Sequence, residues 1–96
     1  MNHPVHILLG LINTIYMSIE KLNPEVIIKL LDEAKINLRG AERGRLNGPQ
    51  CYKFMSNCES LKSETSNPDF QKYYDLLKSI KKANSMYRVF HIDVYV

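Results

Sequence analysis

The chain has 96 residues, of which 45% are hydrophobic and 24% are charged, and its 13 basic and 10 acidic side chains give a net charge of +3. This composition is that of an ordinary globular protein, which argues against a disordered chain and against a membrane protein. A chain of this length forms one domain with one core, and a net charge this small does not by itself indicate a nucleic-acid partner.

The first predicted helix spans residues 4–22 and is the most apolar stretch of the chain. At 100° per residue, all of its apolar side chains except Met17 share an arc of about 200°, with polar residues such as Asn13 on the other side. A helix that is apolar over more than half of its circumference has to be covered from two or more directions. We therefore expect this helix to be the centre of the fold, with its core positions at Leu8, Ile12, Ile15 and Ile19.

Proline marks the start of every predicted helix. Each of the four prolines, Pro4, Pro24, Pro49 and Pro68, follows an asparagine by one or two residues. Proline suits the first helical position because its missing N–H would be unpaired there, and the asparagine can cap the exposed amides. Apolar periodicity extends the later helices over residues 24–39, 49–62 and 68–85. Because the loops between them are short, the sequence predicts an all-α fold, a four-helix antiparallel bundle.

After residue 85 the apolar period changes to that of a strand. Phe90, Ile92, Val94 and Val96 alternate with more polar residues, in a run rich in β-branched and aromatic side chains. We expect one helical domain over residues 1–96, in which residues 86–96 form an extended C-terminal strand or tail. No second strand is evident in the sequence, so this segment is expected either to pack on the helices or to pair with another chain, most simply a second copy. Its apolar side chains are the predicted partner-binding residues.

The two cysteines are expected to be buried, reduced thiols. Cys51 and Cys58 lie roughly 10 Å apart by helical rise, too far for a disulfide. Their spacing fits no common zinc motif, and free thiols favour a reducing compartment. Residues 1–3 have the form of an N-terminal copper or nickel site and residues 79–82 match a Ser-x-x-Lys pattern, but both lack supporting partners. We expect no catalytic residue, no metal and no cofactor.

Basic side chains gather in two segments. Arg39, Arg43 and Arg45 surround two glycines in one predicted loop, and Lys78 and Lys82 lie on the polar side of the fourth helix. Guanidinium and ammonium groups bind phosphate and carboxylate oxygens, so these five residues form a candidate anion-binding site. Solvated lysines on a polar helix face are the commoner meaning of such a group.

Taken together, these features predict a small cytoplasmic protein-binding module without catalytic activity, such as an adaptor, inhibitor, immunity-type or chaperone-like protein. Small size, broad apolar helix faces and an unpaired terminal strand favour another protein, or a second copy of the chain, as the partner. Neither a signal peptide nor a transmembrane span is predicted. The alternative is a nucleic-acid-binding regulator that uses the Arg39–Arg45 loop and the lysine-rich fourth helix, which a steep loss of binding with added salt would reveal.

Overall fold

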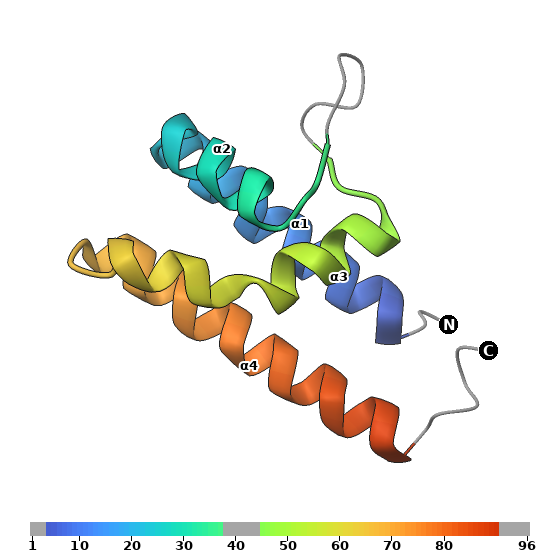
Figure 1. The fold of residues 1–96 in the computed structure, drawn as a ribbon. Coiled ribbons are helices and arrows are strands. Elements are labelled where there is room, and N and C mark those ends of the chain that lie inside the picture. Colours follow the sequence, from blue (N-terminus) through green and yellow to red (C-terminus); the bar gives the residue numbers. More distant parts are fainter. Residues whose placement is uncertain (1–3, 38–44, 91–96) are drawn as a thin grey trace.

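The structure is a computed structural model that describes residues 4–37 and 45–90. Within these residues it contains four α-helices and one 3-10 helix and no strand, so the all-helical class is confirmed (Figure 1). In chain order the elements are α1 (Pro4–Leu22), α2 (Pro24–Glu33), α3 (Gly48–Ser56), the 3-10 helix η2 (Cys58–Glu64) and α4 (Pro68–Phe90).

The helices begin within one residue of the predicted starts, and α2, α3 and α4 begin with asparagine caps. The Oδ1 atom of Asn23 accepts a hydrogen bond from the backbone of α2 at 3.1 Å, and that of Asn67 accepts one from α4 at 2.9 Å. At α3 the cap is reciprocal, because Asn47 accepts from the N–H of Gln50 and Gln50 accepts from the N–H of Asn47, both at 2.9 Å. Each cap satisfies backbone N–H groups that have no partner inside the helix.

The second helix is shorter than predicted and ends at Glu33 rather than at residue 39. It closes in a Schellman turn, in which the N–H of Ile36 donates to the carbonyl of Leu31 at 2.9 Å and the N–H of Lys35 donates to that of Asp32 at 3.0 Å. Lys35 has a φ of 58°, in the left-handed region where glycine is the usual residue. Ile36 is buried, so hydrophobic burial rather than a glycine fixes this stop.

The third helix, predicted over residues 49–62, is divided in two at Asn57. At the break the Nδ2 atom of Asn57 donates to the Oγ of Ser60 at 3.0 Å, and at the end of η2 the Oγ1 of Thr65 donates to the carbonyl of Lys62 at 2.7 Å. Such local bonds offer the chain an alternative to the α-helical pattern, and the chain continues as the tighter helix η2. The predicted apolar seam nevertheless survives the break, with all of its members buried: Cys51, Phe54, Met55, Cys58 and Leu61.

The fourth helix is longer than predicted, because α4 continues to Phe90. The prediction of an extended segment is therefore wrong for residues 86–90, which are helical. Each residue added to an existing helix gains a backbone hydrogen bond within the same chain, and the alternating pattern begins only at Phe90 itself. Of the predicted partner-binding residues, Ile92, Val94 and Val96 lie outside the described residues, and so does the rest of the predicted strand.

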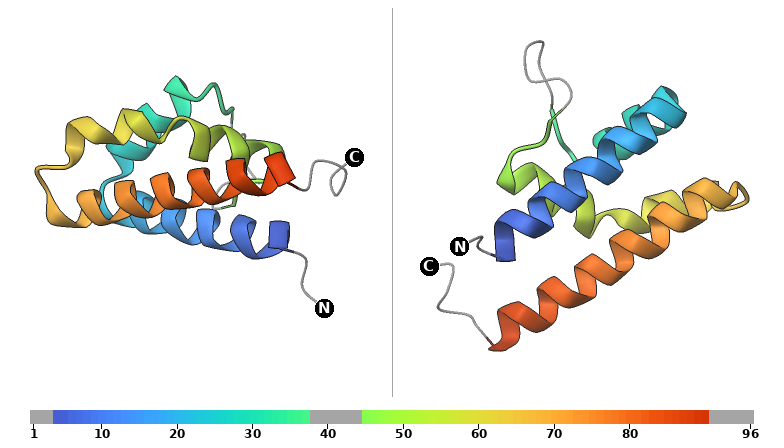
Figure 2. Two further views of the ribbon diagram at one scale, coloured as in Figure 1. Left: turned by 90° about the horizontal axis from the view of Figure 1, so that it is seen from below. Right: turned by 180° about the vertical axis from the view of Figure 1, so that it is seen from behind.

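The helices gather around α1 as the sequence predicts. α1 packs against α2, α3 and α4, and α4 packs in turn against α3 and η2. Figure 2 shows α1 and α4 side by side and running in opposite directions, with the N-terminal end of α1 and the C-terminal end of α4 at the same end of the molecule. Ile12, Ile15 and Ile19 are 3%, 5% and 0% exposed, which confirms α1 as the central helix, while Leu8 is half-buried.

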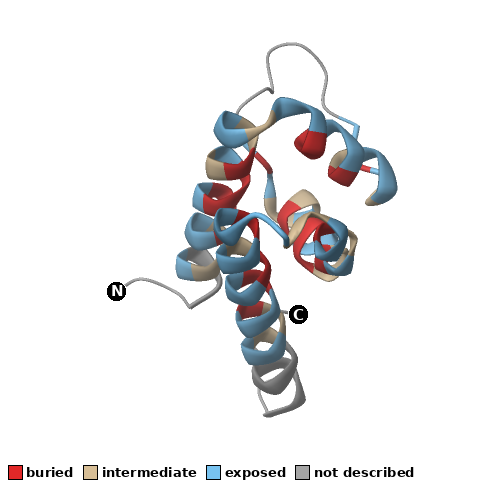
Figure 3. Cartoon of the chain, turned by 90° about the vertical axis from the view of Figure 1, so that its left-hand side faces the viewer, coloured by how far each residue is buried: buried red, intermediate tan, exposed pale blue. Residues whose placement is uncertain are grey.

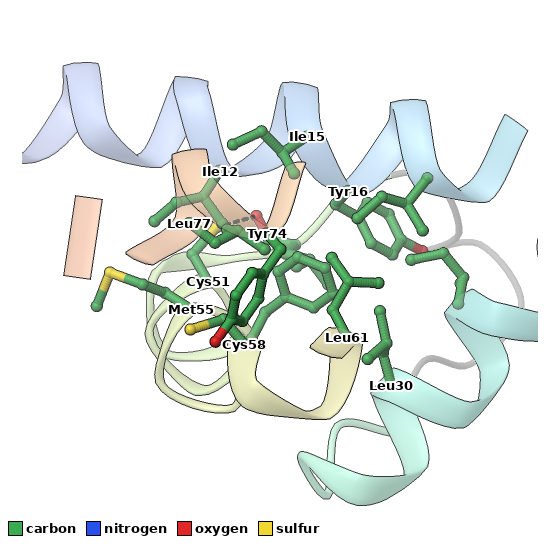
Figure 4. Close-up of a cluster of buried hydrophobic side chains, with 14 of the residues drawn as sticks. Ile12, Ile15, Tyr16, Leu30, Cys51, Met55, Cys58, Leu61, Tyr74 and Leu77 are labelled. Carbon is green, nitrogen blue, oxygen red and sulfur yellow. Dashed lines mark hydrogen bonds between the residues drawn. The ribbon is translucent and has the colours of Figure 1, made fainter. Parts of the chain in front are cut away.

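The core lies between α1, α4 and the α3–η2 segment (Figure 4). Tyr16 of α1 meets the ring of Phe54 edge to face, with ring centroids 5.7 Å apart and an interplanar angle of 87°. Leu61 of η2 and Leu77 of α4 are 0% and 1% exposed, so each element contributes to a single continuous core. Because the inner sides of the helices form this core, a functional site must lie on their outer sides.

Candidate functional site

The predicted anion-binding residues are not gathered at one place in the described structure. Arg39 and Arg43 lie outside the described residues, and Arg45 is exposed just before α3. Lys78 and Lys82 are exposed on α4, where the Nζ of Lys78 lies 5.2 Å from the centroid of the Tyr74 ring. Of the predicted anion-binding residues that are described, Arg45 lies before α3, whereas Lys78 and Lys82 lie on α4. Lys78 is engaged in a cation–π contact.

A polar cluster joins α4 to the α3–η2 segment beside these lysines. The hydroxyl of Tyr74 donates to the Oε2 of Glu59 at 2.9 Å, and this hydrogen bond raises the pKa of Tyr74. The Nζ of Lys81 donates to the carbonyl of Ser56 at 3.2 Å, where it satisfies an acceptor at the end of α3. Both contacts hold the broken third helix against α4, and their role is structural.

The cysteines are free and buried, as predicted. Cys51 is 0% exposed and Cys58 is 2% exposed. Burial raises the pKa of Cys51 to about 11 despite the nearby charge of Arg45, and burial also raises the pKa of Cys58. A buried thiol that stays protonated is a poor nucleophile and a poor metal ligand. Among the residues that the structure describes, no group of three or more His, Cys, Asp or Glu side chains is placed to hold a metal ion.

Asn13 forms a buried polar node that the sequence does not predict, because Asn13 lies just outside the apolar arc of α1. It is 5% exposed. Its Oδ1 accepts from the N–H of Leu46 at 2.7 Å, and its Nδ2 donates to the carbonyl of Leu46 at 3.0 Å and to the Sγ of Cys51 at 3.3 Å. One amide side chain thus pairs both backbone groups of a residue 33 positions away and fixes the entry into α3 on α1.

The candidate site is an exposed apolar stripe on α1, which we call the α1 face. Ile7, Leu11, Met17 and Leu22 are 52%, 48%, 44% and 41% exposed although they belong to the central helix. Figure 3 shows the exposed and buried residues of the helices largely on opposite sides. All four residues of the stripe belong to the exposed class. Ile7, Leu11 and Leu22 form one edge of the 200° apolar arc, Met17 lies outside that arc, and α2, α3 and α4 leave all four exposed.

Small residues lie between these apolar side chains: Gly10, Thr14 and Ser18 complete the α1 face. The hydroxyl of Thr14 donates to the carbonyl of Gly10 at 2.9 Å, and that of Ser18 donates to the carbonyl of Thr14 at 2.8 Å. Both hydroxyl donors are thereby satisfied within the helix, so that covering them leaves no unpaired hydrogen-bond donor. Along α1 no Asp, Glu, Lys or Arg precedes Glu20, and the exposed Lys21 lies on the same side of the helix as Gly10 and Thr14.

No protein-family model matches this chain, and neither the curated proteins nor the solved structures contain a match to it. Among the described helices, none is both long and apolar enough to span a membrane.

Proposed function

We propose that this chain is a small protein-binding module without catalytic activity that docks another protein on the α1 face. The observation that carries the proposal is the exposure of four large apolar side chains along the helix at the centre of the core. Single exposed apolar residues are normal on a protein surface, whereas an aligned set on one face marks an interaction site. Because the buried thiols favour a reducing compartment, we place this activity in the cytoplasm.

The surroundings of Ile28 on α2 show how a single exposed apolar residue differs from such an aligned set. Ile28 is 66% exposed, more than any large apolar residue of the α1 face. It stands among exposed charged side chains, with Glu25, Lys29 and Asp32 within one helical turn. The α1 face instead offers apolar and small uncharged residues over about three helical turns, from Ile7 to Ser18, before the exposed Lys21 is reached. A partner that covers this stretch removes apolar surface from water and desolvates no acidic group, Lys or Arg.

Site-specific photo-crosslinking tests the proposal in cells that make the protein. A photoreactive residue at Leu11 is expected to capture a defined protein, and the same residue at Ile28 serves as the matched control because it is exposed but lies outside the face. The substitution Ile7→Asp should abolish capture from Leu11, since it places a charge on the same face. Equal capture from the two positions, or none from Leu11, would overturn the proposal.

The C-terminal segment is a second surface that the sequence predicts for a partner, through Ile92, Val94 and Val96. We retain strand pairing by residues 91–96 as a proposal, since an apolar strand edge suits strand addition. Replacing Ile92 and Val94 by aspartate is expected to weaken partner capture from a photoreactive residue placed at position 95. Unchanged capture in that double variant would show that this segment makes no contribution.

Nucleic-acid binding is the alternative function, and it rests on the basic residues. Lys78 and Lys82 lie one turn apart and exposed on α4, with Lys72 exposed on the same helix. If these side chains contact phosphates, binding to duplex DNA or RNA must fall steeply as salt is added, because counterions are released on binding. Binding that persists unchanged between low and physiological salt would exclude this function.

A further inference from the structure

We propose that the hydrogen bond from Lys81 to the carbonyl of Ser56 selects between two conformations of residues 57–64. With the bond in place these residues form the 3-10 helix η2, and without it they continue α3 as one α-helix. The proposal concerns another part of the molecule than the α1 face and does not depend on the docking function. It rests on the length of η2, on the hydrogen bonds at the break and on an apolar pattern that fits both helix types.

The first observation is the length of η2, which has seven residues. Runs of 3-10 helix longer than three or four residues are uncommon, because their hydrogen bonds have poorer geometry than those of an α-helix. The apolar periodicity of the sequence itself predicts one α-helix over residues 49–62. The bond between Asn57 and Ser60 favours the break locally, and contacts from other elements have to supply the remaining preference for the 3-10 form.

The second observation is the use of the carbonyl of Ser56. In a continuous α-helix this carbonyl would accept the N–H of Ser60, four residues later. In the structure the N–H of Ser60 donates to the carbonyl of Asn57 at 3.1 Å, which is the 3-10 pattern. The Nζ of Lys81 donates to the carbonyl of Ser56 at 3.2 Å. Lys81 thus satisfies the acceptor that the break deprives of its helical donor, and without Lys81 the N–H of Ser60 is the donor at hand.

The third observation is that the apolar residues permit both conformations. In a 3-10 helix, with three residues per turn, Cys58 and Leu61 lie on one line, and both are buried. In an α-helix continued from α3 they would lie about 60° apart, within the same arc of about 120° as the other members of the apolar seam. Both conformations therefore keep the seam toward the core, and they differ mainly in their polar contacts.

A contact from α2 favours the same conformation as Lys81. The Nζ of Lys29 donates to the Oγ of Ser63 at 3.1 Å and lies 3.9 Å from the Oε2 of Glu64. Seven residues rise about 14 Å in a 3-10 helix and about 10.5 Å in an α-helix, with about 120° and 100° of turn per residue. Conversion would therefore carry Ser63 and Glu64 away from Lys29. Residues 57–64 thus form a two-state element whose equilibrium both α2 and α4 influence.

Nuclear magnetic resonance of the full chain identifies the acceptor of Ser60, through the scalar coupling across the hydrogen bond between its amide nitrogen and a carbonyl carbon. Wild-type protein should show the coupling to Asn57. Lys81→Met should move it to Ser56, and contacts between Hα of residue i and HN of residue i+4 should appear through residues 57–64, as in an α-helix. Because a hydrogen bond from a charged group is lost, the ratio of α-helical to 3-10 conformation should rise at least about tenfold.

Lys82→Met is the matched control, because it removes the same charge from the next residue of α4, which is exposed. It should leave the coupling to Asn57 unchanged. Lys29→Met, which changes an exposed residue of α2, should raise the α-helical fraction by a smaller amount. Coupling to Asn57 that persists in Lys81→Met would overturn the proposal, and so would equal conversion in Lys82→Met. If Lys81→Met does not fold, an unchanged α-helical fraction in Lys29→Met would overturn the two-state element.

Discussion

Replacing Asn13 by alanine tests whether one buried side chain holds the segment that enters α3. Asn13 pairs both backbone groups of Leu46, accepting its N–H at 2.7 Å and donating to its carbonyl at 3.0 Å. Leu46 is itself buried, so in Asn13→Ala its N–H loses this acceptor without gaining water. The carbonyl keeps the thiol of Cys51 as a weak donor at 3.7 Å.

The expected loss follows from these contacts. Leaving a buried polar group without its partner costs about 1–3 kcal/mol. In Asn13→Ala the N–H of Leu46 loses its acceptor completely, whereas the carbonyl of Leu46 keeps one weak donor, so the full cost applies to the N–H and part of it to the carbonyl. We therefore expect Asn13→Ala to lower the free energy of unfolding by about 2–4 kcal/mol. A chain of 96 residues has a total of roughly 5–15 kcal/mol, so this variant should unfold at a markedly lower urea concentration.

Urea unfolding followed by far-UV circular dichroism measures the loss. Thr14→Ala is the matched control, because Thr14 adjoins Asn13 but is exposed and bonds only within its own helix; its effect should stay within about 0.5 kcal/mol. If Asn13→Ala costs no more than Thr14→Ala, the amide does not fix the approach to α3 and the argument from buried backbone groups is refuted.

Four further predictions concern the turn, the thiols and the two sides of α1. Lys35→Gly should raise the free energy of unfolding by about 0.5–1 kcal/mol, because it relieves a left-handed conformation at φ 58°; a loss measured by urea unfolding would contradict the turn. Burial raises the pKa of Cys51 to about 11, so between about pH 8.5 and pH 11 the unfolded chain releases the thiol proton while the folded chain keeps it. The contribution of Cys51 to the free energy of unfolding should therefore be constant up to about pH 8.5 and then fall toward pH 11, and Cys51→Ala should flatten this decline. Cys51 and Cys58 should also react with thiol reagents far more slowly than a free peptide until the protein is unfolded, and rapid labelling of native protein would contradict their burial. Ile12→Ala should lower the free energy of unfolding by about 2–5 kcal/mol, whereas Leu11→Ala should lower it by less than about 1 kcal/mol. Equal losses in urea unfolding would show that α1 does not bury Ile12 and expose Leu11 as described.

The parts of the fold that the sequence predicts are those decided by local chemistry. Asn23, Asn47 and Asn67 cap helices whose first residues lie next to them in the chain, so the capping pattern is legible without knowledge of the fold. The same holds for the apolar stripe of α1, because its periodicity belongs to one helix.

The helix ends and Asn13 depend instead on distant residues. α2 ends where it does because Ile36 is buried in the core, although Lys35 is a poor residue for the turn. Asn13 is buried because Leu46 brings it two backbone groups that need partners, across 33 residues. A helical projection shows only that Asn13 borders the apolar arc next to Leu9 and Tyr16; no local pattern says which polar group it will meet.

The prediction of an extended segment is wrong over residues 86–90 for a related reason. Alternation of apolar and polar residues begins only at Phe90, whereas the predicted segment begins at residue 86, where α4 is still helical. A growing helix gains one hydrogen bond for each residue it adds, whereas a strand gains none until a second strand is present. Continuation of the helix therefore prevails over residues 86–90.

On the uncovered edge of α1, some side chains contribute to folding and their neighbours to association, and a substitution of Leu11 distinguishes the two contributions. Full burial of a leucine side chain contributes about 1.5–3 kcal/mol. Leu11 is already about half covered in the free chain, at 48% exposure, so a partner that covers it can add roughly 1 kcal/mol at this position. Leu11→Ala removes that contribution, so the Kd for the partner captured at the α1 face should rise roughly fivefold, at about 1.4 kcal/mol per factor of ten. Titration of that partner against the wild-type and variant chains measures this rise, and urea unfolding of the same variant should show little change in stability. A variant that loses folding stability but not association would place Leu11 in the core and remove it from the interface.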